Sequence, residues 1–411
     1  MPGTTFPILP QPFLRSIACL LCLSPLLAYS QTKNLVDTTN QRDLIDIAKD
    51  RFHIRMKKMH NRPNRKVYYS LLPTTSSIPG GGTALVTATN ANFWLGNKKN
   101  TSLSNVTFSP STSFTGRYVF PFRSSIWLNN NSWNFLGDTR YFIYPQYTWG
   151  LGGDHEEDAK IVANYQYFRF YHSALKRVKK YPFLFAGLGY DLDVHFAIKT
   201  DNDSLSLGKF TGYRFGTDNN GSSVSSGPVF NVLYDSRDNT VNAYTGLYAN
   251  AIFRVNTRMM GSDDNWQSLF LDARKYISFN KAKKNVLAFW GYYWTAFSNN
   301  VPYLDLPAIG WDPSGRSGRG FQQNRYRGKG LIYLESEYRR DITDNGLLGF
   351  VVFANMNTVT EQYSNQFAYW HPGAGAGLRI KFNKRSNTNV AIDYGVSRKY
   401  NYFWINLGET F

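Results

Sequence analysis

Apolar and polar positions alternate along most of this 411-residue chain, in segments of roughly ten to fifteen residues that begin near residue 66. Gly, Asn, Asp, Ser or Pro bounds each segment, and a period of two between such boundaries is the pattern of half-buried β-strands. The alternation therefore predicts an all-β fold of about sixteen strands. We expect the strands at residues 66–73, 83–96, 102–115, 117–128, 134–149, 159–173, 182–196, 224–236, 244–257, 265–279, 284–298, 329–341, 347–358, 372–383, 387–397 and 401–411.

The predicted strand at 329–341 shows how the two faces of these segments differ. One face carries two carboxylates and a guanidinium, with Leu331, Tyr333, Glu335, Glu337 and Arg339. The other face is mostly apolar, with Ile332, Leu334, Ser336 and Tyr338. Because unpaired buried charges are costly, we expect the charged face to lie in wet, polar surroundings. A polar inner face and an apolar outer face are typical of a transmembrane β-barrel strand.

We therefore predict a transmembrane antiparallel β-barrel of about sixteen strands over residues 66–411, an even count of the kind bacterial single-chain barrels have. An open sheet edge in hydrocarbon leaves unpaired backbone groups, each of which costs several kcal/mol. The first and last strands must then meet, or the seam between them is a weak point.

The composition agrees with a barrel and disfavours a helical membrane protein. Aromatic residues make up 17% of the chain, yet the mean hydropathy is −0.39. Many aromatics in a polar average suit aromatic girdles around a polar lumen. A transmembrane helix requires a run of 18 or more apolar residues, and no such run occurs beyond the N-terminus.

The first thirty residues are predicted to be a secretory signal peptide. Arg15 supplies the positive end, residues 17–27 the apolar run, and residues 28–30 a small-x-small cleavage site. Both cysteines, Cys19 and Cys22, lie inside this segment, so disulfides and cysteine-ligated metals are excluded for the mature chain. The signal predicts export, and with the barrel it predicts the outer membrane of a Gram-negative type of cell.

Residues 31–65 are predicted to be a short periplasmic segment with one possible helix. Leu44, Ile45, Ala48 and Phe52 fall near one helical face. The segment is too short for an independent domain. We favour a periplasmic tail over a plug in the lumen.

The chain is strongly basic, with a formal net charge of +18 and a pI near 9.7. Nucleic acid is not an expected partner because the chain is predicted to be exported. A lumen lined with Arg and Lys, or contact with outer-membrane lipids that carry anionic headgroups of the lipopolysaccharide type, explains the charge better. The alternative is that the excess of basic residues lies on solvated loops and has no binding partner.

The polar residues of the loops do not form a catalytic or metal-binding pattern. The six histidines lack metal-ligand spacing, and residues 155–158 lack the second histidine of a zinc helix. We interpret residues 155–158 and 201–203 as charged or solvated loops. The prediction is a protein that is not an enzyme and uses no cofactor or metal.

The connections around 197–223 and 299–328 are the longest, and the second contains Gly318-Arg319-Gly320-Phe321. This tetrapeptide resembles the V-R-G-[FY] motif of the bacterial surface antigen superfamily, the outer-membrane assembly pores typified by BamA and TamA. In that family the motif lies in a long extracellular loop that folds back into the barrel. The resemblance extends from about residue 80 to residue 411, with Gly318 in place of the family's apolar residue.

The family also holds the loop arginine with acids on the two strands that follow. Glu337 matches the first of these acids, and residues 353–357 match the family's F-x-D-x-G strand with Asn355 in place of the acid. The resemblance implies that Arg319 pairs with Glu337, that Asn355 adds a neutral hydrogen bond, and that Glu335 is a further lumenal partner. An arginine in a solvated loop is the alternative.

A turn motif of the family, D-x-R-D-N…P-x-x-G, also has a match in this chain. Its counterparts are Asp235, Arg237, Asp238 and Gly246, with Ala243 in place of the proline.

The C-terminal segment resembles the signal by which outer-membrane barrels are recognised for insertion. Alternation places on one face Phe403, Ile405, Leu407 and Phe411. We expect Glu409 to be exposed, as a departure from the most apolar form of that signal.

The resemblance implies a non-enzymatic outer-membrane protein that assists insertion or translocation of outer-membrane proteins or lipids. Family members that insert proteins carry periplasmic POTRA domains ahead of the barrel, and residues 31–65 are too few for one. We therefore expect a POTRA-less member, with a partner protein supplying periplasmic domains. Two alternatives stay open: a porin-like channel that favours anions, and a membrane anchor for a separate protein.

Overall fold

A computed structural model describes most of the chain beyond its N-terminal part. The described residues are 40–53, 67–78, 82–113, 116–143, 145–202, 204–280 and 285–411. The predicted signal peptide, with both cysteines, lies outside the described residues.

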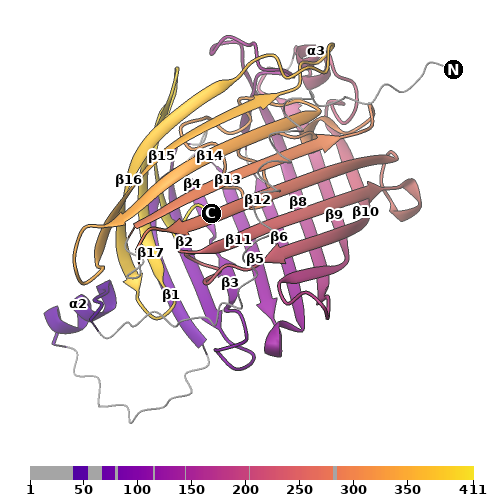
Figure 1. The fold of residues 1–411 in the computed structure, drawn as a ribbon. Coiled ribbons are helices and arrows are strands. Elements are labelled where there is room, and N and C mark those ends of the chain that lie inside the picture. The colour runs from indigo at the N-terminus through magenta and orange to yellow at the C-terminus, as the bar shows by residue number, and fades with distance from the viewer. Residues whose placement is uncertain are drawn as a thin grey trace.

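All the described strands belong to one antiparallel sheet, which wraps around an interior (Figure 1). The strands follow one another around the sheet in sequence order, and the last strand comes back beside the first. The strands are β1 (Val67–Ile78), β2 (Gly82–Phe93), β3 (Ser104–Phe108), β4 (Ser111–Ser113), β5 (Tyr118–Trp127), β6 (Trp133–Ile143), β7 (Gln146–Thr148), β8 (Ile161–Arg177), β9 (Leu184–Thr200), β10 (Gly221–Asp235), β11 (Gly246–Asn256), β12 (Trp266–Ser278), β13 (Asn285–Ala296), β14 (Gly330–Asp341), β15 (Leu348–Val359), β16 (His371–Asn383), β17 (Thr388–Ser397) and β18 (Asn401–Leu407).

These eighteen described strands occupy sixteen positions in the sheet. Strands β3 and β4 both pair with β2 and β5, so together they fill one position. Strands β6 and β7 likewise both pair with β8. Pro110 and Pro145 lie at these two interruptions, where a residue without a backbone N–H cannot donate a hydrogen bond to the ladder. Each predicted segment matches one position, and the all-β antiparallel prediction is confirmed.

The predicted separation of faces is present, but the inner face is not wet as expected. On β14 the outward Leu334 is 41% exposed, whereas the inward Glu335 is 4% exposed. The inward charges are compensated by oppositely charged side chains rather than by water, which satisfies the same electrostatic requirement. The interior at this position is therefore a packed ionic core.

The helix expected near residue 44 is present as α2 (Leu44–Arg51), and it docks on the turn between β16 and β17. Asp43 caps the helix by accepting from Asp46 N at 2.8 Å, and its other carboxylate oxygen accepts from Lys384 N at 2.9 Å. Lys384 Nζ lies 2.7 Å from Asp46 Oδ2. The helix is thus held at one end of the sheet, opposite the short helix α3 (Leu207–Thr211) in Figure 1. Of the described helices, none has the length and apolar character needed to cross a membrane.

Replacing Asp43 with alanine is expected to loosen α2 by about 1 kcal/mol, the usual cost of a lost N-cap. Amide exchange over residues 44–51 should then accelerate by roughly fivefold. Asp50→Ala is the matched control, because Asp50 lies on the same helix with a largely exposed side chain. Equal exchange rates in Asp43→Ala and wild type would contradict the anchoring role.

Candidate functional site

The loop at 299–328, between β13 and β14, folds into the interior and packs against the inner faces of several strands. Tyr303 and Ile309 are fully buried, and Tyr303 belongs to a cluster with aromatic residues of β6, β8 and β12. Arg327 Nη1 donates to Tyr303 O at 2.8 Å and to Leu306 O at 3.1 Å. These buried contacts give the loop a fixed path, which is unusual for a connection of this length.

Arg319 lies near the middle of this loop and is 1% exposed. Its Nη2 contacts the carboxylates of Glu335 and Glu337, and its Nη1 donates to Asp393 Oδ2 at 3.0 Å. The guanidinium also lies over the ring of Phe353, 3.6 Å from its centroid. The Arg319–Glu337 pair expected from the sequence is present, Glu335 is the further lumenal partner that was expected, and the structure adds Asp393.

The pKa of Arg319 reports the balance of forces at this site. Burial alone would lower the pKa of the guanidinium, because it disfavours the charged form. The carboxylates of Glu335, Glu337 and Asp393 outweigh burial and raise the pKa well above its ordinary value. Arg319 is therefore a permanent cation that the strand carboxylates hold in place.

The backbone of the loop is fastened at the same point. Asn355 Nδ2 donates to Arg319 O at 2.8 Å, the neutral hydrogen bond predicted for this strand. Gly320 has φ +92°, and an added Cβ would lie 2.8 Å from Val396 O. Gly318 also has a positive φ, +81°. Glycine thus allows the loop backbone to lie directly against β17.

Phe321, the last residue of the tetrapeptide, is buried beside Arg319 in an aromatic cluster. Its ring centroid lies 6.0 Å from that of Tyr326. The four residues of the motif therefore combine two backbone turns, one charge and one aromatic anchor.

A chain of ion pairs extends from Arg319 to the C-terminus. Glu337 also binds Arg339, and Arg379 Nη1 lies 2.6 Å from Asp393 Oδ1. Arg379 Nε in turn donates to Glu409 Oε2 at 2.7 Å. We call the seven residues the clasp: Arg319, Glu335, Glu337, Arg339, Arg379, Asp393 and Glu409. Three guanidiniums face four carboxylates, so the clasp is nearly neutral and tolerates burial.

Sequence reasoning missed Arg379, Asp393 and Glu409 as members of the clasp. These two strand residues, Arg379 and Asp393, lie in the predicted strands 372–383 and 387–397, for which the sequence indicated no ionic role. The strand register would have indicated that Arg379 and Asp393 are neighbours. Asp393 lies opposite Gly377, which is two residues from Arg379 on the same strand, and the side chains of Arg379 and Asp393 both lie on the inward face of the sheet. Which inward residues of β16 and β17 the loop reaches depends on the folded path of the loop.

The expectation of an exposed Glu409 is wrong. Glu409 is 1% exposed, and Asn389 Nδ2 donates to its Oε1 at 2.7 Å. Burial would raise the pKa of this carboxyl, but Arg379 and Arg339 lower it below its usual range. The arginines make burial of the carboxylate favourable, which its sequence neighbours could not indicate.

Three of the four C-terminal residues share one face as predicted, and Phe411 does not. On β18, Phe403, Ile405 and Leu407 lie opposite Tyr394, Ile392 and Val390, on the face away from the inward Asp393. Phe403 is 57% exposed there, whereas Leu407 is buried in a cluster with Ala88 and Val390, and Ile405 packs against that cluster. After β18 ends, Gly408 takes φ +99° and the chain turns inward. Phe411 then packs against Trp290, 5.2 Å between ring centroids. The period-two alternation ended at Leu407, so extending it to residue 411 gave the wrong face.

The turn between β10 and β11 forms a separate hydrogen-bonded unit and does not join the clasp. Arg237 pairs with both carboxylate oxygens of Asp235, at 2.9 and 2.8 Å. Asp238 Oδ1 accepts from Tyr244 N at 2.9 Å, and Gly246 has φ +116°. Tyr244 OH also donates to Oδ1 of Asn387, 2.9 Å away in the β16–β17 turn. The motif thus ties two turns together at the end of the sheet where α2 docks.

The described residues contain no cluster of three or more His, Cys, Asp or Glu suited to a metal ion. The carboxylates of the clasp are instead occupied by arginines. The clasp can hold the loop at 299–328 in place by electrostatic attraction, and release of the loop would leave its carboxylates without Arg319.

No family model matches the chain, and no curated protein matches it in sequence. Solved structures similar to it include BamA from Haemophilus ducreyi lacking POTRA domains 1–3, with TM-score 0.51, 14% identity, and 88% of this chain and 76% of that chain covered. CdiB from Acinetobacter baumannii gives TM-score 0.54 and 15% identity, covering 84% of this chain and 60% of that chain. CdiB from Escherichia coli gives TM-score 0.55 and 12% identity, covering 84% of this chain and 63% of that chain.

This chain therefore has a BamA-like β-barrel fold, the fold that BamA and CdiB share. It spans less than two thirds of the length of either CdiB structure.

Proposed function

We propose that this chain is a non-enzymatic outer-membrane β-barrel that assists the insertion or translocation of outer-membrane proteins or lipids. One observation carries the proposal. The interior of the barrel holds an ordered loop at 299–328, and Arg319 fastens it to carboxylates on β14 and β17. A loop fastened inside the lumen suits a pore that stays closed until a cargo or partner displaces it.

The fold supports this proposal as analogy, since fold does not fix function. The predicted export signal and the outward apolar faces support a place in the outer membrane, where we expect anionic headgroups of the lipopolysaccharide type to contact the barrel. We further propose that a partner protein supplies periplasmic domains. The end of the barrel where α2 docks is the candidate surface for that partner.

The porin-like alternative has one observation in its favour, which is the number of arginines on the inner walls. Arg123, Arg169 and Arg254 all face the interior. Asp138 and Asp193 lie close to these arginines, and the loop at 299–328 occupies part of the lumen. A closed, loop-filled barrel is therefore the better interpretation than an open anion channel.

Reconstitution tests the proposed function directly. The purified full chain in liposomes should accelerate folding of a urea-denatured outer-membrane barrel added from outside, compared with empty liposomes. Folding is measured as the heat-sensitive shift in gel migration of the added protein. Liposomes with an unrelated porin are the control for mere bilayer disturbance. No acceleration together with steady anion conductance would replace the proposal with the porin-like channel.

A further inference from the structure

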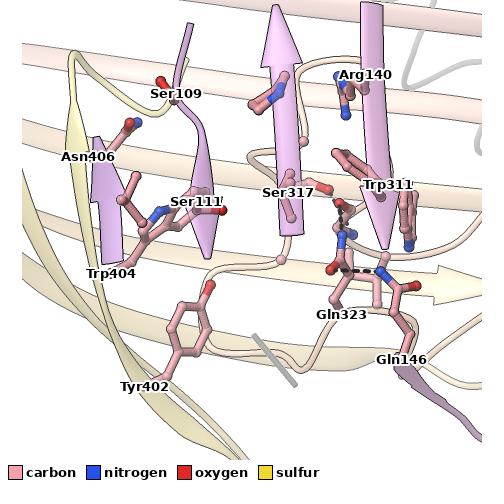
Figure 2. A pocket seen from close by; sticks show the side chains of 18 of the residues that line it. Ser109, Ser111, Arg140, Gln146, Trp311, Ser317, Gln323, Tyr402, Trp404 and Asn406 are labelled. Carbon is pink, nitrogen blue, oxygen red and sulfur yellow. Dashed lines mark hydrogen bonds between the residues drawn. The ribbon is translucent and has the colours of Figure 1, made fainter. Parts of the chain in front are cut away.

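A second feature of the interior is a cavity of about 250 Å³ between the loop and the wall formed by β2, β4, β5, β6 and β18. Figure 2 shows Ser109, Ser111 and Tyr402 on one side of it and Arg140, Trp311 and Ser317 on the other. The cavity is large enough for several water molecules or one small ligand. Its lining is distinct from the residues of the clasp.

The charge of this lining has one sign. Arg123 and Arg140 line the cavity, and no described residue of the lining is an Asp or a Glu. The neighbouring cavity under the same loop, of about 280 Å³, differs, because Asp138, Asp191 and Asp193 are among its lining residues. Arg123 lines both cavities, so its guanidinium lies between a space without a lining carboxylate and one that has three aspartates, whereas Arg140 lines only the first.

The carboxylate nearest to these arginines is already shared. Asp138 binds Arg140, with Nε to Oδ1 at 2.6 Å. Its oxygens lie 3.7 Å from Arg123 Nε and 3.6 Å from Arg169 Nη1, both beyond hydrogen-bond range. Three guanidiniums therefore share this carboxylate, and only Arg140 lies within hydrogen-bond range of it. Arg123 has no carboxylate within hydrogen-bond range among the described residues.

Two donors at the cavity have unmet hydrogen-bonding capacity. Arg123 Nε and Trp311 Nε1 are buried and find no hydrogen-bond partner among the described residues. A buried unpaired donor costs about 1–3 kcal/mol, and more when it is charged. Arg123 Nη1 meets only a neutral acceptor, Ser314 O. What the cavity lacks is a hydrogen-bond acceptor that carries negative charge.

We propose that this cavity binds a phosphate-type oxyanion, with Arg123 as its principal ligand and Arg140 as a second cation. Arginine forms charge-assisted, often bidentate hydrogen bonds with phosphate oxygens. The serine hydroxyls of the lining can donate to the remaining oxygens. Apolar side chains complete the opposite wall, among them Ala88 and Ile405, where β18 comes beside β2. The anion can thus be a free phosphate or the headgroup of a phosphomonoester lipid.

The test uses the purified full chain in a neutral detergent free of phosphate. Inorganic phosphate and short-chain phosphatidic acid are titrated separately, with binding followed by calorimetry and by the fluorescence of Trp311 and Trp404, which both line the cavity. Arg123→Gln should weaken binding about tenfold or more, because it removes charge-assisted hydrogen bonds. Arg258→Gln is the matched control, since Arg258 is exposed on a loop.

Each result has a definite meaning. Saturable binding of inorganic phosphate that depends on Arg123 supports a site for the free ion. Binding of phosphatidic acid alone, again dependent on Arg123, supports the lipid headgroup. If the wild type binds neither ligand, or if Arg123→Gln binds as the wild type does, the proposal is overturned. The wild-type titration decides the matter even if the variant fails to fold.

Discussion

Replacing Arg319 with alanine is expected to free the loop at 299–328 from the interior and to raise the ion conductance of the barrel. Arg319 is the residue through which the loop reaches Glu335, Glu337 and Asp393. Removing one partner of a buried ion pair typically costs about 3–5 kcal/mol, because it leaves uncompensated charge behind. That cost is avoided if the loop moves out and water enters.

The charge left behind falls mainly on one residue. Glu337 keeps Arg339, and Asp393 keeps Arg379, whereas Glu335 keeps only the hydroxyl of Tyr333. Combining Arg319→Ala with Glu335→Gln should therefore recover part of the lost stability, a coupling of about 1–3 kcal/mol that a double-mutant cycle measures.

Planar-bilayer conductance and thermal unfolding check this prediction. Wild type should be nearly closed, and both Arg319→Ala and Glu337→Ala should raise its conductance, while Arg258→Ala on an exposed loop should leave it unchanged. A wild type that is already a steady anion channel, with neither clasp variant altering it, would favour the porin-like alternative.

Replacing Gly320 with alanine is expected to displace the same loop without removing any charge. The new Cβ would meet the backbone of Val396, which cannot rotate away as a side chain would. A positive φ costs a non-glycine residue about 1–2 kcal/mol, and overpacking adds roughly 1–3 kcal/mol. The free energy of unfolding should fall by several kcal/mol and conductance should rise.

Gly261→Ala separates the two contributions. Gly261 has φ +89°, close to the +92° of Gly320, but an added Cβ there would meet nothing within 4 Å. It should therefore show the backbone cost alone, with conductance unchanged. Equal effects of the two substitutions would show that the contact with β17 does not hold the loop.

The order of the strands and the faces of most of them follow from sequence alone. The inward position of Glu337 and the outward position of Leu334 come from a period of two, which any strand in a two-sided environment must obey. The helix α2 likewise follows from the local spacing of its apolar residues. These features depend on residues close in sequence, so the periodicity of apolar and polar residues predicts them.

The partners of the clasp and the position of the C-terminus are decided only by the tertiary structure. Arg319 meets Asp393 across 74 residues, and Glu409 is buried because Arg379 comes to it from another strand. The loop and the sheet together fix these distances. Alternation specifies which side of a strand a residue faces, but the energy of a buried charge depends on what the folded chain brings opposite it.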